Sequence, residues 1–233
     1  MTAYGTENKS KREAWIDKTL RSLPEGLRIL DAGAGEQAHK PACQHLKYVS
    51  QDFAQYDGQG DNRGLQMQAW DYAKLDIVSD ITAIPEKDAS FDAILCTEVF
   101  EHLPEPVQAL KEFHRLLKQG GALIMTAPFC SLTHFSPYHY YSGYNRYFYE
   151  MHLPRLGFDI LELENNGDYF EYLAQELHRL PQVAADYSGI NLRGRFFNLV
   201  LGYLIKSLGK CSRVQNSSGD ILCFGYHVRA IKR

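Results

Sequence analysis

The chain has 233 residues, of which 45% are hydrophobic and 23% charged, with 18 glycines and 9 prolines. This is the composition of a globular protein, and it excludes collagen, coiled coil and general disorder. Because 25 Lys and Arg stand against 28 Asp and Glu, the formal charge is only -3. We therefore do not expect nucleic acid as a partner.

The cysteines and the apolar segments indicate the compartment. Five cysteines are widely spaced and form no CxxC pair, which argues against a disulfide framework or a zinc knuckle and favours a reducing, cytoplasmic setting. The N-terminus is polar, and the longest apolar stretch, 196–205, is interrupted by Asn198 and Gly202. It is far shorter than the ~20 residues of a membrane span, so we expect no export signal and no transmembrane segment.

Apolar periodicity predicts helices and strands in alternation. Residues 7–23 indicate an amphipathic helix, and a buried strand follows at 27–32, ending in a glycine-rich turn. A helix-compatible segment precedes a strand at 47–52, whereas 53–74 is polar and irregular. The later elements are a helix that stops at Gly120–Gly121 and five strands, within or at 76–81, 91–103, 122–129, 158–164 and 221–231.

This alternation predicts a doubly wound α/β fold with a mostly parallel sheet, in which ligands bind at the carboxyl ends of the strands. We expect one domain over 1–233, with its core at 27–164. A helical insertion at 165–220 precedes the last strand and is expected to form a lid or a homodimer interface. Basic residues beside its second helix also leave a peripheral membrane contact open.

Carboxylates follow each of the first four predicted strands, namely Asp31, Asp52, Asp80 and Glu98. The turn at 33–38 even matches the dinucleotide pattern G-x-G-x-x-A. However, a carboxylate immediately before that turn would repel a pyrophosphate, whereas it would attract the amino group and sulfonium of S-adenosylmethionine. The charge of Asp31 therefore favours the sulfonium cofactor, although each acid taken alone could simply cap a turn.

Several motifs together resemble those of class I S-adenosylmethionine-dependent methyltransferases, and of the type 11 branch in particular. They are LDAGAG, Asp52, the pair Asp80–Ile81, FDAILCTEVFEHL and LLKQGGALIMTAPF, and they lie within 27–164. The resemblance implies a Rossmann-like seven-stranded sheet with an antiparallel last strand. It also implies a cofactor site made of Asp31, Ala32, Gly33, Gly35, Asp52, Phe53, Asp80, Ile81 and Thr97. Gln37 stands where the family often has a third glycine.

Methyl transfer to a hydroxyl benefits from a base, and histidine has the pKa nearest to neutrality. Two histidines near the predicted strand ends, His102 and His134, are therefore the candidate catalytic residues, together with Glu98 near the methyl group. Glu98, Glu101 and His102 have helical spacing and, with His134, could instead hold a divalent cation, as in the similar E-x-x-E-H site of small-RNA 2'-O-methyltransferases. We favour a site without a metal.

The segment 134–149 contains six tyrosines and is the strongest candidate for acceptor recognition. Its aromatic faces and hydroxyl tips suit a saccharide or another polyhydroxylated small molecule. The residues assigned to this role are Tyr138, His139, Tyr140, Tyr144 and Arg146. An aromatic cover over the sheet is the structural alternative.

The sequence thus predicts an S-adenosylmethionine-dependent O-methyltransferase of a saccharide or small polar metabolite. Three alternatives stay open: N-methylation of an amino sugar, a nicotinamide-dependent oxidoreductase, and a non-catalytic protein that binds the cofactor. The oxidoreductase is less well supported, because the chain contains no Tyr-x-x-x-Lys pair to relay a proton.

Overall fold

The computed structural model describes residues 4–61, 63–65, 69, 71–72, 74–214 and 217–233. They form two compact units, one of Ala14–Glu164 with Gly225–Arg233 and the other of Met1–Glu13 with Asn165–Phe224. The division at 164/165 coincides with the predicted start of the helical insertion. The assignment of the whole chain to a single domain stays a prediction.

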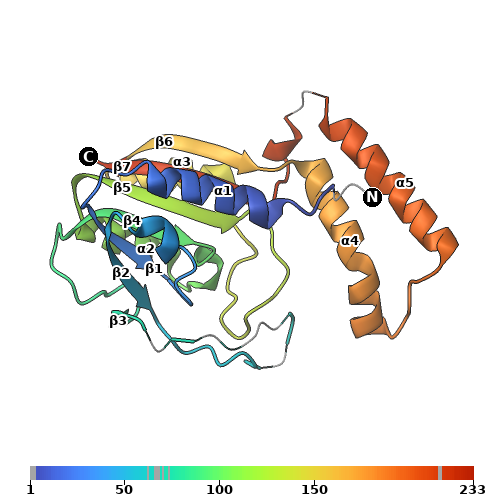
Figure 1. Ribbon diagram of the computed structural model, residues 1–233, viewed down its shortest axis with the longest axis horizontal. Coiled ribbons are helices and arrows are strands. Elements are labelled where there is room, and N and C mark those ends of the chain that lie inside the picture. Colours follow the sequence, from blue (N-terminus) through green and yellow to red (C-terminus); the bar gives the residue numbers. More distant parts are fainter. Residues whose placement is uncertain (1–3, 62, 66–68, 70, 73, 215–216) are drawn as a thin grey trace. The chain divides into compact units, whose positions relative to one another are not determined.

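A seven-stranded sheet dominates the first unit, in the order β3-β2-β1-β4-β5-β7-β6 (Figure 1). The strands are β1 (Arg28–Ala32), β2 (Lys47–Asp52), β3 (Ile77–Val78), β4 (Phe91–Thr97), β5 (Leu117–Pro128), β6 (Phe158–Asn166) and β7 (Gly225–Lys232). Pairing is parallel from β3 through β5, and β7 runs antiparallel to β5. This confirms the predicted fold class.

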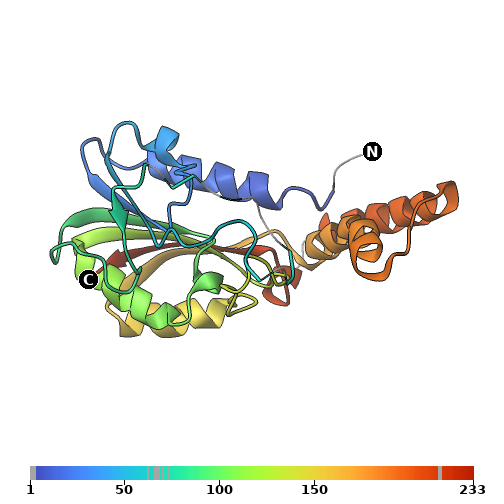
Figure 2. The ribbon, with the colours of Figure 1, turned by 90° about the horizontal axis from the view of Figure 1, so that it is seen from below.

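Helices cover both faces of the sheet. The part of α1 (Asn8–Arg21) in this unit lies over one face, and α2 (Pro106–Leu116) and α3 (Arg146–Arg155) lie over the other (Figure 2). Ile16 and Leu20 of α1 pack into a core cluster with Ile29, Leu95 and Ile124 of the central strands. Because the central strands are buried on both faces, their sequences are continuously apolar rather than alternating.

Three local predictions were wrong. Residues 36–46 form turns and the short 3-10 helix η1 (Lys40–Cys43), because Gln37 adopts a φ of +60° and Pro41 lacks an amide hydrogen. Gly120 and Gly121 do not end α2, since β5 already begins at Leu117 and its pairing with β4 is irregular there. Residues 146–149, the end of the segment expected to recognise the acceptor, instead begin helix α3 (Arg146–Arg155), whose first turn is capped by the Asn145 side chain.

The second unit contains two long helices, α4 (Tyr169–Ser188) and α5 (Arg195–Ser212), which lie side by side in both views (Figures 1 and 2). Asp168 caps α4 by accepting a hydrogen bond from the Glu171 amide at 2.9 Å. Gly189 ends α4 with a φ of +69°, a left-handed conformation that favours glycine. Among the residues that the structure describes, neither these helices nor any other combine the length and apolarity needed to cross a bilayer.

Candidate functional site

The glycine turn after β1 is held tightly against its neighbours. Gly33 and Gly35 have φ values of +79° and +49°, and the amides of Gly33 and Ala34 both donate to the Gln51 carbonyl at 2.9 Å. A Cβ atom added to Gly33 would lie 2.4 Å from Cγ2 of Val99. Only glycine therefore fits here, because the backbone conformation and the close approach of Val99 both exclude a side chain.

Asp52 at the end of β2 joins this turn to the next loop. Its carboxylate accepts hydrogen bonds from the amides of Gly35 and Ala54, both at 2.9 Å, and the residue is almost fully buried. Burial raises the pKa of Asp52, and the backbone hydrogen bonds oppose that rise. Asp52 thus closes the glycine turn with its carboxylate.

Asp31 is also buried, and its partner is a residue that sequence analysis missed. The Tyr48 hydroxyl of β2 donates to Oδ2 of Asp31 at 2.5 Å. Burial raises the pKa of Asp31 to about 7, and the nearby Asp52 acts in the same direction, whereas the Tyr48 hydrogen bond lowers it. The carboxyl group is therefore poised to titrate near neutral pH and to respond to a nearby positive charge.

The other residues predicted to contact the cofactor differ in their burial and in their partners. Asp80 is exposed, and its Oδ1 accepts from the amide and the hydroxyl of Thr82, both at 2.8 Å. Ile81 is buried, as is Ala32. Thr97 Oγ1 lies 3.2 Å from Nε2 of His39, and the ring of Phe53 meets that of Tyr138 edge-on at 5.0 Å. The Asp80 side chain thus caps a local turn, which is the structural alternative to a cofactor contact for this residue.

Glu98 leaves β4 in a left-handed conformation, with a φ of +53°. Its amide donates to the Thr126 carbonyl at 2.9 Å, and its Oε1 accepts from the Thr126 hydroxyl at 3.0 Å. The short helix η2 (Phe100–His102) begins only after this kink. The spacing argument that placed Glu98 on one helical face with Glu101 and His102 therefore does not hold.

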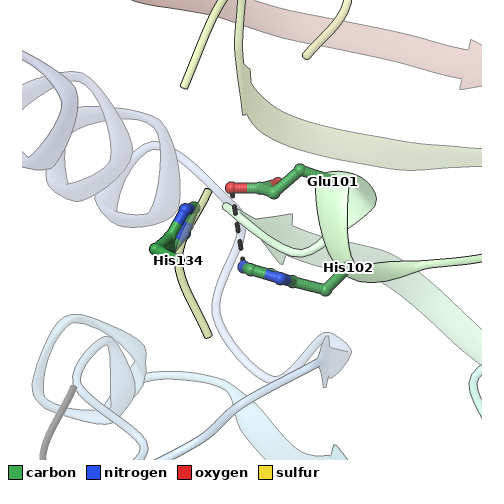
Figure 3. A group of neighbouring side chains, drawn as sticks. All are labelled: Glu101, His102 and His134. Atoms are coloured by element: carbon green, nitrogen blue, oxygen red, sulfur yellow. Dashed lines mark ion pairs between the residues drawn. The ribbon is translucent and has the colours of Figure 1, made fainter. Parts of the chain in front are cut away.

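Two histidines come together beside Glu101, as Figure 3 shows. The rings of His102 and His134 are 4.8 Å apart, and Nε2 of His102 lies 3.8 Å from Oε1 of Glu101. Nδ1 of His102 is 2.6 Å from the Tyr138 carbonyl oxygen, and Nδ1 of His134 is 2.9 Å from that of Leu132. A carbonyl oxygen only accepts, so Nδ1 carries the hydrogen in both rings. Each neutral ring is therefore left with Nε2 as a proton acceptor.

Burial makes the His102 imidazole a weak base. Burial lowers the pKa of His102 to about 3, so this ring stays neutral throughout the physiological range. His139, whose ring is 4.9 Å from that of His134, also has a lowered pKa because of burial. His134 lies in the loop after β5 and is only partly buried. Of the two candidate bases, His134 is therefore the better placed to take up a proton.

Glu101, His102 and His134 could also hold a metal ion. Their candidate ligand atoms all lie within 4.8 Å of one another. Two imidazole nitrogens and one carboxylate oxygen form a donor set that suits zinc and other first-row divalent metals. Glu98, the fourth member of the set considered from sequence, is not part of this group.

The aromatic segment divides into two parts. Tyr138 and His139 lie beside the histidines, and Tyr140 is 49% exposed, with its amide bound to the Glu101 carbonyl at 2.9 Å. In contrast, Tyr144 is buried, and its hydroxyl donates to the Phe100 carbonyl at 2.9 Å. Arg146 begins α3 and pairs with Glu150 at 3.1 Å. Tyr138, His139 and Tyr140 thus remain beside the candidate site.

Sequence reasoning also missed residues that hold the site together. Phe135 stacks on Tyr56 with ring centres 3.7 Å apart and lies 4.8 Å from the His102 ring. Val99 contacts the glycine turn, and its carbonyl accepts from the His102 amide at 2.9 Å. Val99 therefore connects the predicted cofactor turn directly to the histidine cluster. An apolar residue in a strand-end loop carries no sequence signal for such a role.

Comparisons with known proteins find methyltransferases. Residues 30–125 match the type 11 family of methyltransferase domains. A ubiquinone biosynthesis O-methyltransferase of Xanthomonas campestris is 39% identical over 108 residues, which are 45% of this chain and 44% of that protein. A second one, from Xylella fastidiosa, is 37% identical over 122 residues, or 48% and 46% of the two chains. The matches thus span less than half the length of these curated relatives.

A solved structure with a similar fold is a phosphoethanolamine N-methyltransferase of Haemonchus contortus bound to S-adenosylhomocysteine and phosphomonomethylethanolamine. It has 18% identity and a TM-score of 0.52, covering 96% of this chain and 52% of that one. At this identity the likeness concerns the fold alone. Together with the family match, it confirms the resemblance predicted from the sequence.

Proposed function

Residues 30–125 form a class I methyltransferase domain, and from this premise we propose that the protein transfers a methyl group from S-adenosylmethionine to a hydroxyl group of a small polar molecule. The observation that carries the proposal is the link made by Val99. It places an imidazole pair next to the glycine turn that would hold the cofactor. The names of the curated relatives support an oxygen acceptor.

The residues present fit this cofactor. Gly33 and Gly35 form a tight left-handed turn directly after β1, and Asp52 offers a carboxylate at the end of β2 for ribose hydroxyls. The buried carboxyl of Asp31 gives a cationic amino acid group a counter-charge. A pyrophosphate would instead face this carboxyl at the turn, which disfavours a nicotinamide dinucleotide here.

When bound, the cofactor supplies an electrophilic methyl group on a positively charged sulfur. Nε2 of His134 would take up the proton that the acceptor hydroxyl loses on receiving this methyl group. The hydrogen bond from Nδ1 of His134 to the Leu132 carbonyl keeps the ring in the tautomer that can accept it. Alignment of the two reactants contributes a further part of the rate.

His102 and Glu98 have supporting roles in this proposal. Since the pKa of His102 is about 3, its neutral ring orients the acceptor through Nε2 rather than removing the proton. Glu98 fixes the end of β4 on β5 through Thr126. Glu101 stands beside both rings and stabilises the charge that a protonated imidazole carries.

For the acceptor we propose a saccharide, held by Tyr138, His139 and Tyr140. The support is the exposed aromatic surface beside the histidines, which suits the C–H face of a sugar ring. Tyr144 and Arg146, also assigned to the acceptor from sequence, have partners elsewhere and are not required for this contact.

A transfer assay tests the proposal. The protein is incubated with cofactor labelled in the methyl group and with two acceptor panels, one of saccharides and one of phenols of the kind from which quinones are made. Label in an ether of the saccharide panel supports the full proposal, and label in the phenol panel retains O-methylation but replaces the saccharide. Label on nitrogen, or cofactor binding without any transfer, overturns it.

A further inference from the structure

Helix α5 exposes an apolar stripe along its N-terminal half. Its members are Phe196, Leu199, Val200, Tyr203 and Leu204, with exposed fractions of 80%, 70%, 38%, 69% and 44%. Their spacing of i, i+3, i+4, i+7 and i+8 places them on one helical face. Scattered apolar residues are common on protein surfaces, but a continuous stripe of this kind marks a binding surface.

The opposite face of α5 already packs within its own unit. Ile205 and Gly209 are buried, and the backbone of Gly209 lies against the ring of Tyr4. The Ser212 hydroxyl donates to the Asp168 carboxylate at 2.7 Å. The exposed stripe is therefore additional to the face by which the helix is held in the fold.

The charge of this region has a single sign. From Tyr187 to Gly219 the sequence has no Asp or Glu, whereas it has five cations: Arg193, Arg195, Lys206, Lys210 and Arg213. At 3.6 residues per turn, Arg195, Lys206 and Arg213 fall within about 20° of one another, along one border of the stripe. In a chain with a net charge of -3, this concentration of positive charge is local.

We infer that α5 binds the surface of an anionic phospholipid bilayer, with its apolar stripe among the acyl chains and its basic border against the phosphates. A helix that joins an apolar face to Lys and Arg is suited to the plane of such an interface. A second copy of the chain is a less suitable partner for the apolar stripe of α5. Two such stripes packed together would gather cations from both copies, and this segment supplies no acid to neutralise them.

Vesicle flotation of the full chain tests the inference. Large vesicles of phosphatidylcholine with about a third phosphatidylglycerol are compared with vesicles of phosphatidylcholine alone. We expect the protein to float with the anionic vesicles only. Binding should weaken as salt rises from 0.1 M to 1 M, because the Debye length falls from about 10 Å to about 3 Å.

Two kinds of variant separate the apolar and charged contributions. Phe196→Ser with Tyr203→Ser, and Lys206→Glu with Lys210→Glu, should each weaken binding at least about tenfold, from the lost apolar burial and the lost attraction respectively. The matched controls are Ile221→Ser, at a residue that is 71% exposed, and Lys9→Glu, whose side chain is 78% exposed. Both controls should bind as the unchanged protein does, and thermal unfolding verifies that every variant is folded.

A fluorescent probe reports the depth of insertion directly. Phe196→Trp should shift its emission to the blue and be quenched by brominated acyl chains when anionic vesicles are added. The inference is overturned if the protein stays with the buffer, or if the α5 variants float like the controls. It is also overturned if sedimentation shows a dimer that dissociates on Phe196→Ser while vesicle binding is absent.

Discussion

The hydroxyl of Tyr48 donates to the carboxyl group of Asp31 at 2.5 Å, across the neighbouring strands β2 and β1. This contact sits beside the turn that we propose for the cofactor. Because burial raises the pKa of Asp31 to about 7, the charge state of the site changes within the physiological range. Binding of a cation and loss of a proton are then linked.

We therefore expect cofactor affinity to rise between pH 6 and pH 8. The pKa of Asp31 in the free protein is raised to about 7, and a bound cation favours the ionised form, so binding near pH 7 should release protons. Titration calorimetry in buffers of different ionisation enthalpy measures this release. An affinity that is flat over this range, without proton release, would contradict the linkage.

Two variants sharpen this prediction. Tyr48→Phe removes the hydrogen bond that lowers the pKa of Asp31, so the rise in affinity should move to higher pH. The Asp31→Asn variant should bind the cofactor weakly, and its affinity should not depend on pH over this range. Folding stability of the free protein depends on pH in the opposite direction and falls as pH rises. The reason is that the pKa of Asp31 in the folded protein lies above its ordinary value of 3.8. The contribution of Asp31 to folding stability is complete below about pH 4 and is lost as pH rises through 7.

His134→Ala should lower kcat by about 10² to 10⁴, because the proposed proton acceptor is lost. Binding of S-adenosylhomocysteine should not change, since His134 is not among the residues proposed to hold the cofactor. Steady-state kinetics and titration calorimetry measure the two effects. His152→Ala, at a partly buried histidine of α3, is the control and should retain full turnover. Equal kcat values for the two variants would exclude His134 as the base.

Removal of metal distinguishes the two chemistries open to Glu101, His102 and His134. If His134 accepts the proton, dialysis against a chelator should leave kcat unchanged, and added zinc should inhibit by occupying its Nε2. If the three residues hold a catalytic metal, dialysis should abolish turnover, and a divalent cation should restore it. The second result would replace the general-base mechanism with metal-assisted activation of the hydroxyl.

Tyr140 and Tyr144 should respond differently to substitution, although sequence assigned both to the acceptor. Tyr140→Ala should raise the KM for the acceptor without changing Tm, since the side chain is about half exposed. Tyr144→Phe should instead cost about 1 kcal/mol of folding stability, because its hydroxyl donates to the buried Phe100 carbonyl. Tyr147→Ala, at a residue 70% exposed on α3, is the control and should change neither quantity. An unaltered KM for Tyr140→Ala would remove it from the acceptor site.

The strands and the strand-end acids could be predicted because they depend on local pattern. Continuous apolar runs identify β4 and β5 as central, and a glycine turn after an acid identifies the end of β1. The pairing of Asp31 with Tyr48 could not be predicted, since it depends on the register between β1 and β2. The direction of Glu98 relative to Glu101 and His102 could not be predicted either. Helical spacing assumes a regular helical backbone, whereas Glu98 has a φ of +53°. Similarly, α3 was not predicted because Tyr147 and Tyr149 at its start belong to the tyrosine-rich segment 134–149.

Gly33→Ala separates backbone strain from steric crowding at the turn. Gly33 and Gly26 have nearly equal φ values, +79° and +78°, but a Cβ on Gly26 would meet nothing within 4 Å. Gly26→Ala should therefore cost only the left-handed strain of about 1 to 2 kcal/mol. Gly33→Ala should cost more and abolish cofactor binding, because its Cβ would lie 2.4 Å from Cγ2 of Val99. Adding Val99→Ala should recover part of the stability but not the strain, as chemical denaturation can measure. Equal losses for the two glycine variants would show that Val99 yields easily and does not connect the turn rigidly to the histidine cluster.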